Sequence, residues 1–241
     1  MTTTRTIALI AISMAFSSQV FARDLLTPHR AEYKVKISIV SGKLSTELRR
    51  TENGYVARHI VRPVGISRLL TRGIMDVTSE FASGPDGIVP ISYKAINTIG
   101  KHPDVDLHFD WSTHEATGTI GDKEIVLQLD ELAHDSVSIQ YALMRDLMNG
   151  GAGSRYALFD VDNIRTANVT MIGNRQVTTY AGKFQAIGIQ HHKEGSSRTT
   201  TLWCVEELDY LPVIIEQHRK GKLKFRATLL KYIPTDQASQ E

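Results

Sequence analysis

An acidic stretch near the middle of the chain carries the residue types that most clearly suggest chemistry. Asp104, Asp106, His108 and Asp110 occupy every second position, so a β-strand would point all four side chains to one face. Carboxylate and imidazole groups bind zinc and harder metal ions. However, alternate strand residues lie about 6.6–6.8 Å apart, so four of them cannot share one ion. A solvated strand face, which half-buried antiparallel strands show routinely, is the alternative, and we predict no metal site.

Histidine and serine residues elsewhere do not form a recognisable catalytic arrangement. His191 and His192 are adjacent on a predicted strand, so their side chains point to opposite faces. The tripeptide at 134–136 has the residue types of a hydrolase triad, but consecutive residues cannot place the imidazole between the other two groups. The sequence also lacks nucleophile-elbow, zinc-protease, phosphate-loop and paired-cysteine motifs. We therefore predict no catalytic residue and no cofactor.

An irregular segment at residues 63–73 contains arginines that are candidates for binding an anion. Arg62 precedes this segment, and Arg68 and Arg72 lie within it. A guanidinium group can hold a carboxylate or phosphate through two parallel hydrogen bonds. Arg68 and Arg72 are therefore candidate contacts for an anionic sugar or a lipid head group. The alternative is that these side chains are simply solvated.

One convincing helix is predicted, within Asp135–Gly151 and centred on residues 136–149. Asp135 or Ser136 can cap its start, and the two glycines at 150–151 can end it. Four apolar side chains recur at helical spacing on one face: Val137, Tyr141, Met144 and Met148. Because methionine adapts to irregular shapes, Tyr141, Met144 and Met148 are candidates for contacting an apolar ligand. A filled protein core is the alternative.

A predicted hairpin near the C-terminus carries a further candidate. Trp203 and Cys204 lie on the predicted strand Thr199–Val205, which pairs with Val213–His218 around an acidic turn. Trp203 is a candidate ligand contact. Cys204 is the sole cysteine of the sequence, so it cannot form a disulfide within the chain. No local motif supplies a base for it, which favours a small buried hydrophobic side chain.

Most of the remaining chain alternates apolar and polar residues with a period of two, which is typical of half-buried strands. The opening meander covers residues 30–61, with a tight hairpin at Asn53–Gly54. Further along, Gly173–Asn174 is expected to separate the strands Thr166–Ile172 and Arg175–Tyr180. Strand–helix alternation is absent from the sequence. We expect a mainly β fold: a single-domain antiparallel barrel or half-barrel of about a dozen strands, with one amphipathic helix packed on or in it.

The N-terminus has the three-part pattern of a cleavable secretory signal. Arg5 is followed by the apolar run Ile7–Phe16 and by small residues before position 23. That run is shorter than the roughly 20 residues that span a bilayer. We expect a signal peptide at residues 1–22, a periplasmic protein without a transmembrane segment after cleavage, one β-rich domain at 23–241, and a disordered tail at 234–241. With 28 basic and 26 acidic residues the net charge is +2, which argues against a nucleic-acid partner.

Several short motifs, in a fixed order, suggest a family. They are DGIVPISYK (86–94), LHFDW (107–111), DSVSIQYAL (135–143), YAGKFQAI (180–187) and LWCVEELDYLPVII (202–215). With these motifs and its secretory pattern, the sequence resembles the bacterial exported proteins grouped as domain of unknown function 3108. The resemblance covers about residues 28–233. The resemblance implies a periplasmic β-rich fold and supplies no catalytic residues. The last motif is also similar to the closing hairpin of periplasmic lipoprotein-carrier half-barrels.

We therefore expect a non-enzymatic periplasmic binding or carrier protein for a lipid-like or saccharide ligand. One alternative is an enzyme acting on envelope polymers through the acidic strand 104–110 or the histidine pair at 191–192. Another is an envelope assembly factor that acts through its surface. The residues do not define an oligomeric state.

Overall fold

The computed structural model describes residues 26–37, 40–70, 73–99, 103–160 and 163–235. The expected signal peptide, Arg72 and residues 236–241 of the expected tail lie outside these described residues. The last strand continues to Pro234, and the N–H of Thr235 donates a hydrogen bond to the carbonyl of Pro28 at 2.8 Å. The two ends of the described chain therefore lie side by side.

The N-terminal half consists of eight strands that follow one another as a meander. They are β1 (His29–Ile37), β2 (Val40–Thr51), β3 (Gly54–Pro63), β4 (Met75–Gly84), β5 (Gly87–Asn97), β6 (Val105–Asp110), β7 (Glu115–Ile120) and β8 (Lys123–Gln128). A four-residue helix, α1 (Ser67–Leu70), lies between β3 and β4. The predicted tight hairpin is present between β2 and β3, where Thr51 pairs with Gly54.

The C-terminal half begins with a short strand and the predicted helix. Its elements are β9 (Ala133–His134), α2 (Ser138–Met148), β10 (Arg155–Asp160), β11 (Asn163–Thr178), β12 (Lys183–Lys193), β13 (Arg198–Val205), the 3-10 helix η1 (Glu206–Leu208), β14 (Leu211–Arg219) and β15 (Lys222–Pro234). Among the described residues, no helix combines the length and the apolar character needed to cross a membrane.

The described strands join into one fifteen-stranded sheet, a few more than the predicted dozen. Its order is β8-β7-β6-β5-β4-β3-β2-β1-β15-β14-β13-β12-β11-β10-β9. The first and last strands of the chain pair with each other, so the two halves meet at the centre of the sheet. Neighbouring strands are antiparallel except β9 and β10, which are parallel. The strands β8 and β9 stand at the two edges of the sheet and do not pair with each other. Of the two predicted forms, a barrel and a half-barrel, the fold is therefore a half-barrel.

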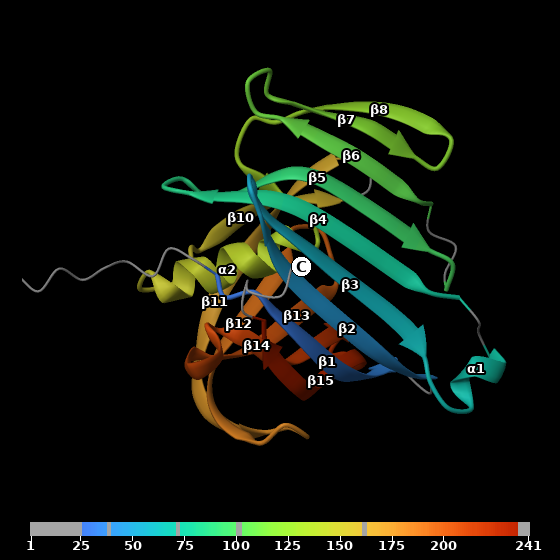
Figure 1. The fold of residues 1–241 in the computed structure, drawn as a ribbon, viewed down its shortest axis with the longest axis vertical. Coiled ribbons are helices and arrows are strands. Elements are labelled where there is room, and N and C mark those ends of the chain that lie inside the picture. Colours follow the sequence, from blue (N-terminus) through green and yellow to red (C-terminus); the bar gives the residue numbers. More distant parts are fainter. Residues whose placement is uncertain (1–25, 38–39, 71–72, 100–102, 161–162, 236–241) are drawn as a thin grey trace, which may run out of the picture.

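The sheet curves around α2, which packs against β4 and β5 on the concave side (Figure 1). Alternate strand residues face this side and form the core, because successive side chains on a strand point to opposite faces. On β6, for example, Leu107 and Phe109 are buried, while Asp106, His108 and Asp110 are exposed. This alternation agrees with the prediction. The short α1 projects on the right of the view, opposite the end of α2 on the left.

The turn predicted at Gly173–Asn174 is wrong. Gly173 and Asn174 do not separate two strands, because β11 continues through them from Asn163 to Thr178. The pairing of β11 with β12 shifts its register between Met171 and Gly173, and Gly173 has a φ of 93°. A glycine with positive φ is a common way to build a β-bulge, which bends a strand without ending it. The bulge leaves β11 and β12 as one long curved hairpin.

Candidate functional site

The start of α2 is fixed by a buried carboxylate. Oδ1 of Asp135 accepts hydrogen bonds from the backbone N–H groups of Val137 (2.7 Å) and Ser138 (2.9 Å), which satisfies free donors at the helix start. Its Oδ2 accepts a 2.6 Å bond from the hydroxyl of Ser79 on β4. Burial raises the pKa of Asp135, and these hydrogen bonds oppose that rise. Asp135 is thus the predicted cap, and its role is structural.

Tyr141 lies within the hydrophobic core. Its side chain is fully buried, and its ring stacks on Phe81 with centroids 5.2 Å apart. The rings of His29 and His59 each lie 6.3 Å from it. Met144, one turn further along α2, is also buried. These contacts favour the filled-core alternative for this helix face.

Three buried polar atoms around Tyr141 make no hydrogen bond with the described residues. They are the Tyr141 hydroxyl, Nε2 of His29 and Nε2 of His59. Buried polar groups in proteins normally form hydrogen bonds, so three such atoms without a partner are unusual for a protein core. Burial lowers the pKa of His59 to about 4 and also lowers the pKa of His29. Both rings are therefore neutral near pH 7.

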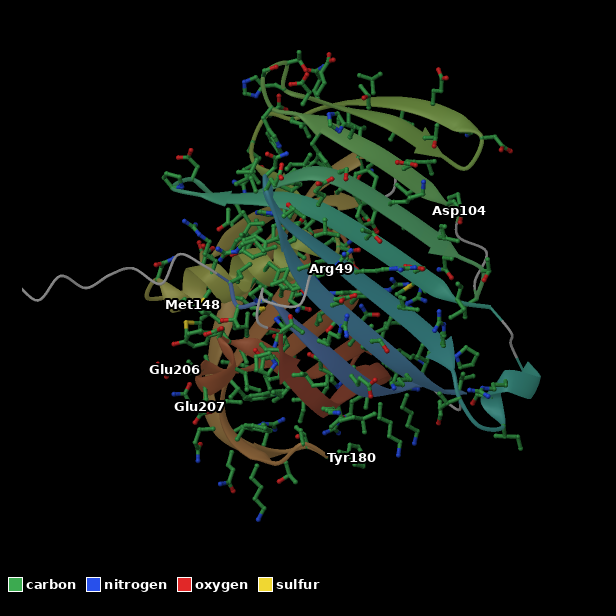
Figure 2. All side chains as sticks on the ribbon, in the orientation of Figure 1. Arg49, Asp104, Met148, Tyr180, Glu206 and Glu207 are labelled. Carbon is green, nitrogen blue, oxygen red and sulfur yellow. The ribbon has the colours of Figure 1, made fainter. Side chains whose placement is uncertain are left out.

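The other predicted contacts are spread over the molecule. Met148 is partly buried at the end of α2, and Figure 2 shows it on the left. Arg68 is exposed on α1, at the opposite end of the sheet, where its Nε lies 3.5 Å from the carbonyl of Pro63. Trp203 on β13 is buried under the guanidinium of Arg175, whose central carbon lies 3.7 Å from the indole centroid. Tyr141, Met148, Arg68 and Trp203 therefore do not form one site, and Arg72 lies outside the described residues.

The acidic strand has structural partners. Asp106 forms an ion pair with Lys94 at 2.7 Å, and Asp104 accepts a bond from the N–H of Asn97. Asp110 accepts bonds from the hydroxyl and N–H of Ser112, which lower its pKa. Within the described ranges, no group of three or more His, Cys, Asp or Glu residues is arranged to hold a metal ion. These contacts favour the solvated-face interpretation of this strand.

A pocket beside α2 contains several titratable groups. We call it the acidic pocket, with a volume of about 210 Å³, and its polar lining residues are Asp86, Glu131, His134, Asp146, Arg155 and Tyr156. The hydroxyl of Tyr156 donates a 2.5 Å bond to Asp146, which together with burial raises the pKa of Tyr156. Burial lowers the pKa of His134 to about 4. A general acid or base works best with a pKa near the working pH, and both shifts move the pKa values of these two side chains away from pH 7.

A larger pocket lies on the convex face of the sheet, and the sequence analysis did not find it. We call it the cationic pocket; its volume is about 470 Å³, and it is lined by Lys34, Lys36, Thr178, Thr179, Tyr180, Arg226 and Thr228. Alternate outward residues of β1 and β15 form its floor. The turn between β11 and β12 forms its wall, because the N–H of Tyr180 donates a 3.1 Å bond to the carbonyl of Leu229 on β15. Figure 2 shows Tyr180 at the tip of this hairpin.

The strand pairing concentrates positive charge in this pocket. Lys36 stands directly opposite Arg226 on β15, and Lys34 stands directly opposite Lys43 on β2. Like charges in directly opposite positions destabilise a sheet. Arg226 reaches Glu216 at 3.4 Å and Lys43 reaches Glu32 at 2.6 Å, but no carboxylate lines the pocket itself. An anion bound there would offset the repulsion.

The pocket also offers hydroxyl groups and an aromatic ring. Lys34 Nζ donates a 2.9 Å bond to the Tyr180 hydroxyl, which orients the ring at the pocket edge. Tyr180 is 62% exposed, so its ring remains available to a ligand. Three threonine side chains add donors and acceptors on the floor and wall. Ammonium and guanidinium groups, hydroxyls and one aromatic face together suit a hydroxyl-rich anion.

Sequence reasoning missed this pocket because its parts come from distant segments. The alternation that places Lys34 and Lys36 on one face is visible in the sequence, and so is the alternation of Arg226 and Thr228. Nothing in the sequence alone shows that β1 and β15 are neighbours, or that the β11–β12 turn folds over them.

Comparisons with known proteins support the fold and leave the activity open. A β-barrel-like protein of domain of unknown function DUF1849 from Brucella abortus is 15% identical, with 88% of this chain and 99% of that chain covered and a TM-score of 0.60. A protein from Bacteroides fragilis with a YmcC-like fold, described as exported, is 11% identical over 86% of this chain and 94% of that chain. Its TM-score of 0.32 is too low to imply a shared fold. No curated protein matches the chain.

The family assignment rests on a separate match. The family model described as protein of unknown function (DUF3108) matches residues 30–228, from the first strand into the last. The match covers most of the chain and both halves of the sheet, and it confirms the family that the sequence motifs suggested. The chain therefore belongs to the DUF3108 family.

Proposed function

We propose that this protein is a non-catalytic binding protein of the periplasm, and that its cationic pocket holds an acidic saccharide. The ligand class is a sugar that bears a phosphate or carboxylate group, either free or as the head group of a lipid. The observation that carries the proposal is a pocket of about 470 Å³ lined by three cations and four hydroxyl-bearing side chains, without a carboxylate.

The arrangement of charge supports an anionic ligand. Lys36 and Arg226 are held opposite each other by the pairing of β1 with β15, and the nearby carboxylate of Glu216 contacts Arg226 but does not line the pocket. Hydrogen bonds to ionised phosphate or carboxylate oxygens are about twice as strong as neutral ones. Close like charges are unfavourable in the free protein, so an anion that neutralises them would bind more tightly.

The hydroxyl groups and the tyrosine support a sugar rather than a bare anion. Thr178 and Thr228 lie on the two sides of the pocket, on β11 and β15, and can bind sugar hydroxyls from both sides. Tyr180 presents an exposed ring at the edge, where it can pack against the apolar face of a sugar. Binding sites of this kind combine an apolar surface with a few placed polar groups.

The pattern of a secretory signal at residues 1–22 supports a periplasmic location. Acidic saccharides and sugar-bearing lipids are components of bacterial envelopes, so ligand and location agree. The contacts of the acidic strand and the pKa directions in the acidic pocket support a non-catalytic role.

Nuclear magnetic resonance titration tests the proposal. Glucose 6-phosphate, glucuronate and glucose are added in turn to the chain that begins at residue 23. We expect the two anionic sugars to shift the backbone amide signals of Thr179, Tyr180 and Thr228, and glucose to bind at least about tenfold more weakly, since a charge-assisted bond contributes about 1.5–3 kcal/mol.

Substitutions locate the binding. Arg226→Gln should weaken binding of glucose 6-phosphate by about tenfold or more, and Tyr180→Ala should weaken binding of all three sugars. Arg49→Gln is the matched control, because Arg49 is an exposed arginine on β2 far from this pocket. Shifts that map to the acidic pocket instead, or equal affinities for glucose and glucose 6-phosphate, would refute the proposal.

A further inference from the structure

Three cations stand in a row on three adjacent strands at one end of the sheet. Arg198 on β13 is directly opposite Arg219 on β14, and Arg219 is directly opposite Lys222 on β15. All three side chains are exposed. Directly opposite like charges destabilise a sheet, so this row is unfavourable for the protein on its own.

Two further lysines extend the row. Lys220 lies in the turn between β14 and β15, and Lys224 follows two residues after Lys222; both are exposed. We call Arg198, Arg219, Lys220, Lys222 and Lys224 the basic rim. Within the part of the chain that the structure describes, none of these five forms an ion pair. Glu216, which lies on β14 three residues before Arg219, pairs with Arg226 rather than with a residue of the basic rim. Among the described residues, the positive charge of the rim is therefore not neutralised by any ion pair.

Large apolar side chains are exposed at the same end of the sheet. Leu223, between two lysines of the basic rim, is 47% exposed. Ile37 at the end of β1 is 40% exposed, and it stands opposite Phe225 of β15. Ile66, just before α1, is 79% exposed. The segment of Ile66 is tied to the same end because the hydroxyl of Ser67 accepts a 2.9 Å bond from the N–H of Ser41 on β2.

We propose that this end of the sheet docks on the surface of an anionic lipid bilayer. Apolar side chains that project from a basic surface can enter the boundary between head groups and acyl chains, while lysine and arginine remain at the phosphates. The exposed leucine and isoleucines would have no role in contacting a nucleic acid, which is bound chiefly through its phosphates. The combination therefore fits a lipid surface better than a bare polyanion.

The opposite end of the sheet supports this orientation. η1 places Glu206 and Glu207 there, and both are exposed (Figure 2). The turn between β4 and β5 adds Asp86 at that end. A negatively charged surface would attract the basic rim and repel these three acids, which favours an approach with the basic rim first.

The inference does not rest on the proposed function, although the two are compatible. Arg226 of the cationic pocket lies two residues beyond Lys224 on the same strand, β15. Docking of the rim would bring that pocket close to the head groups. The two sites remain separable by substitution, because Leu223, Arg219 and Lys222 do not line the pocket.

Vesicle co-sedimentation tests the proposal with the chain that begins at residue 23, which includes every described residue. The probes are vesicles of phosphatidylcholine alone and vesicles of phosphatidylcholine mixed with phosphatidylglycerol. We expect binding to the mixed vesicles, weakening as salt is raised, since salt screens exposed charges. We expect little binding to phosphatidylcholine alone.

Substitutions at the rim give the expected magnitudes. A Lys or Arg near an anionic surface contributes roughly a fivefold factor in binding, so Arg219→Gln with Lys222→Gln should lower the partition constant roughly 25-fold. Leu223→Ser should lower it by up to about tenfold without changing the charge. Arg49→Gln with Arg155→Gln removes the same charge from exposed sites elsewhere and should leave binding unchanged.

Three results would overturn the proposal. They are absence of binding to the mixed vesicles, equal binding to both kinds of vesicle, and an equal loss in the rim and control double variants. Tyr180→Ala separates the two proposals, because it should weaken sugar binding and leave vesicle binding intact. Failure of sugar binding with intact vesicle binding would refute the proposed function alone.

Discussion

Ser79 on β4 donates a 2.6 Å hydrogen bond to the carboxylate of Asp135, and both residues are fully buried. The same carboxylate caps α2. The pair therefore joins the helix start to a strand of the sheet, and it sets where α2 enters the concave side. A second bond, of 3.0 Å between the hydroxyls of Tyr93 and Ser136, holds the neighbouring residue to β5.

Asp135→Ala should be among the costlier polar substitutions in this protein. It removes the helix cap and leaves the Ser79 hydroxyl and two backbone N–H groups without their acceptor, so the free energy of unfolding should fall by about 2–4 kcal/mol. Urea denaturation measures it. Ser136→Ala, which removes one partly exposed bond, is the control and should cost about 1 kcal/mol or less. Equal losses would contradict the anchoring role.

Tyr141→Phe should be neutral or should stabilise the protein by up to about 1 kcal/mol, because it removes a buried hydroxyl that has no partner among the described residues. Tyr141→Ala should cost about 3–5 kcal/mol, since it opens a cavity in the core. Thermal and urea unfolding of the two variants test this. A loss above about 1 kcal/mol for Tyr141→Phe would mean that the hydroxyl is hydrogen-bonded in the folded protein.

Stability should fall as pH is lowered from about 6.5 towards about 4. Burial lowers the pKa of His59, His134 and His191 to about 4, from 6.5 in an exposed ring. In that interval the unfolded chain binds more protons than the folded one, so acid favours unfolding. Each ring contributes at most about 3 kcal/mol to the free energy of unfolding, and this contribution is fully present above pH 6.5. Protonation of Asp135, whose pKa is raised, offsets part of the loss at the acidic end.

Urea midpoints measured across that pH interval check this expectation. His59→Gln should flatten the curve, because it removes one of the titrating rings. His192→Gln is the matched control, since His192 is exposed on the same strand as His191. A stability that is flat between pH 6.5 and 4, or equally affected by the two variants, would show that burial of these rings does not control acid unfolding.

Lys36→Glu should stabilise the protein and weaken its binding of an anionic sugar. A glutamate opposite Arg226 replaces a like-charge pair with an attractive one, so stability should rise by about 0.2–1 kcal/mol, while affinity for glucose 6-phosphate should fall at least about tenfold. Lys94→Glu is the contrasting control, because Lys94 stands opposite Asp106, and stability should fall without an effect on binding. A stabilised Lys36→Glu variant with unchanged affinity would contradict the pocket assignment.

The strands and the helix could be predicted because their patterns are local. Leu107 and Phe109 alternate with acidic residues, and that period alone identifies a half-buried strand. Asp135 was a recognisable cap for the same reason. Gly173 was misinterpreted because a glycine at a bulge and a glycine in a turn look alike in sequence.

The candidate site could not be predicted, because it depends on pairing between distant segments. Lys36 and Arg226 are 190 positions apart in the sequence, and their juxtaposition comes from the register of β1 with β15. Trp203 packs under Arg175 and Tyr141 stacks on Phe81 in the core, and the residue types alone do not distinguish these two environments. Which apolar side chains remain exposed is decided by tertiary packing, and residue type alone does not reveal it.

The pairing of the first strand with the last has a consequence for how the chain folds. Each half of the sheet consists mainly of hairpins between neighbouring strands, and such hairpins form quickly because their loops are short. The β1–β15 ladder, in contrast, must close a loop of nearly the whole chain. Its full register needs residues 225–234 of the last strand, so joining the two halves is expected to be the slow step. Until then β1 and β14 each expose a free edge, and sheet extension by another chain is the competing reaction.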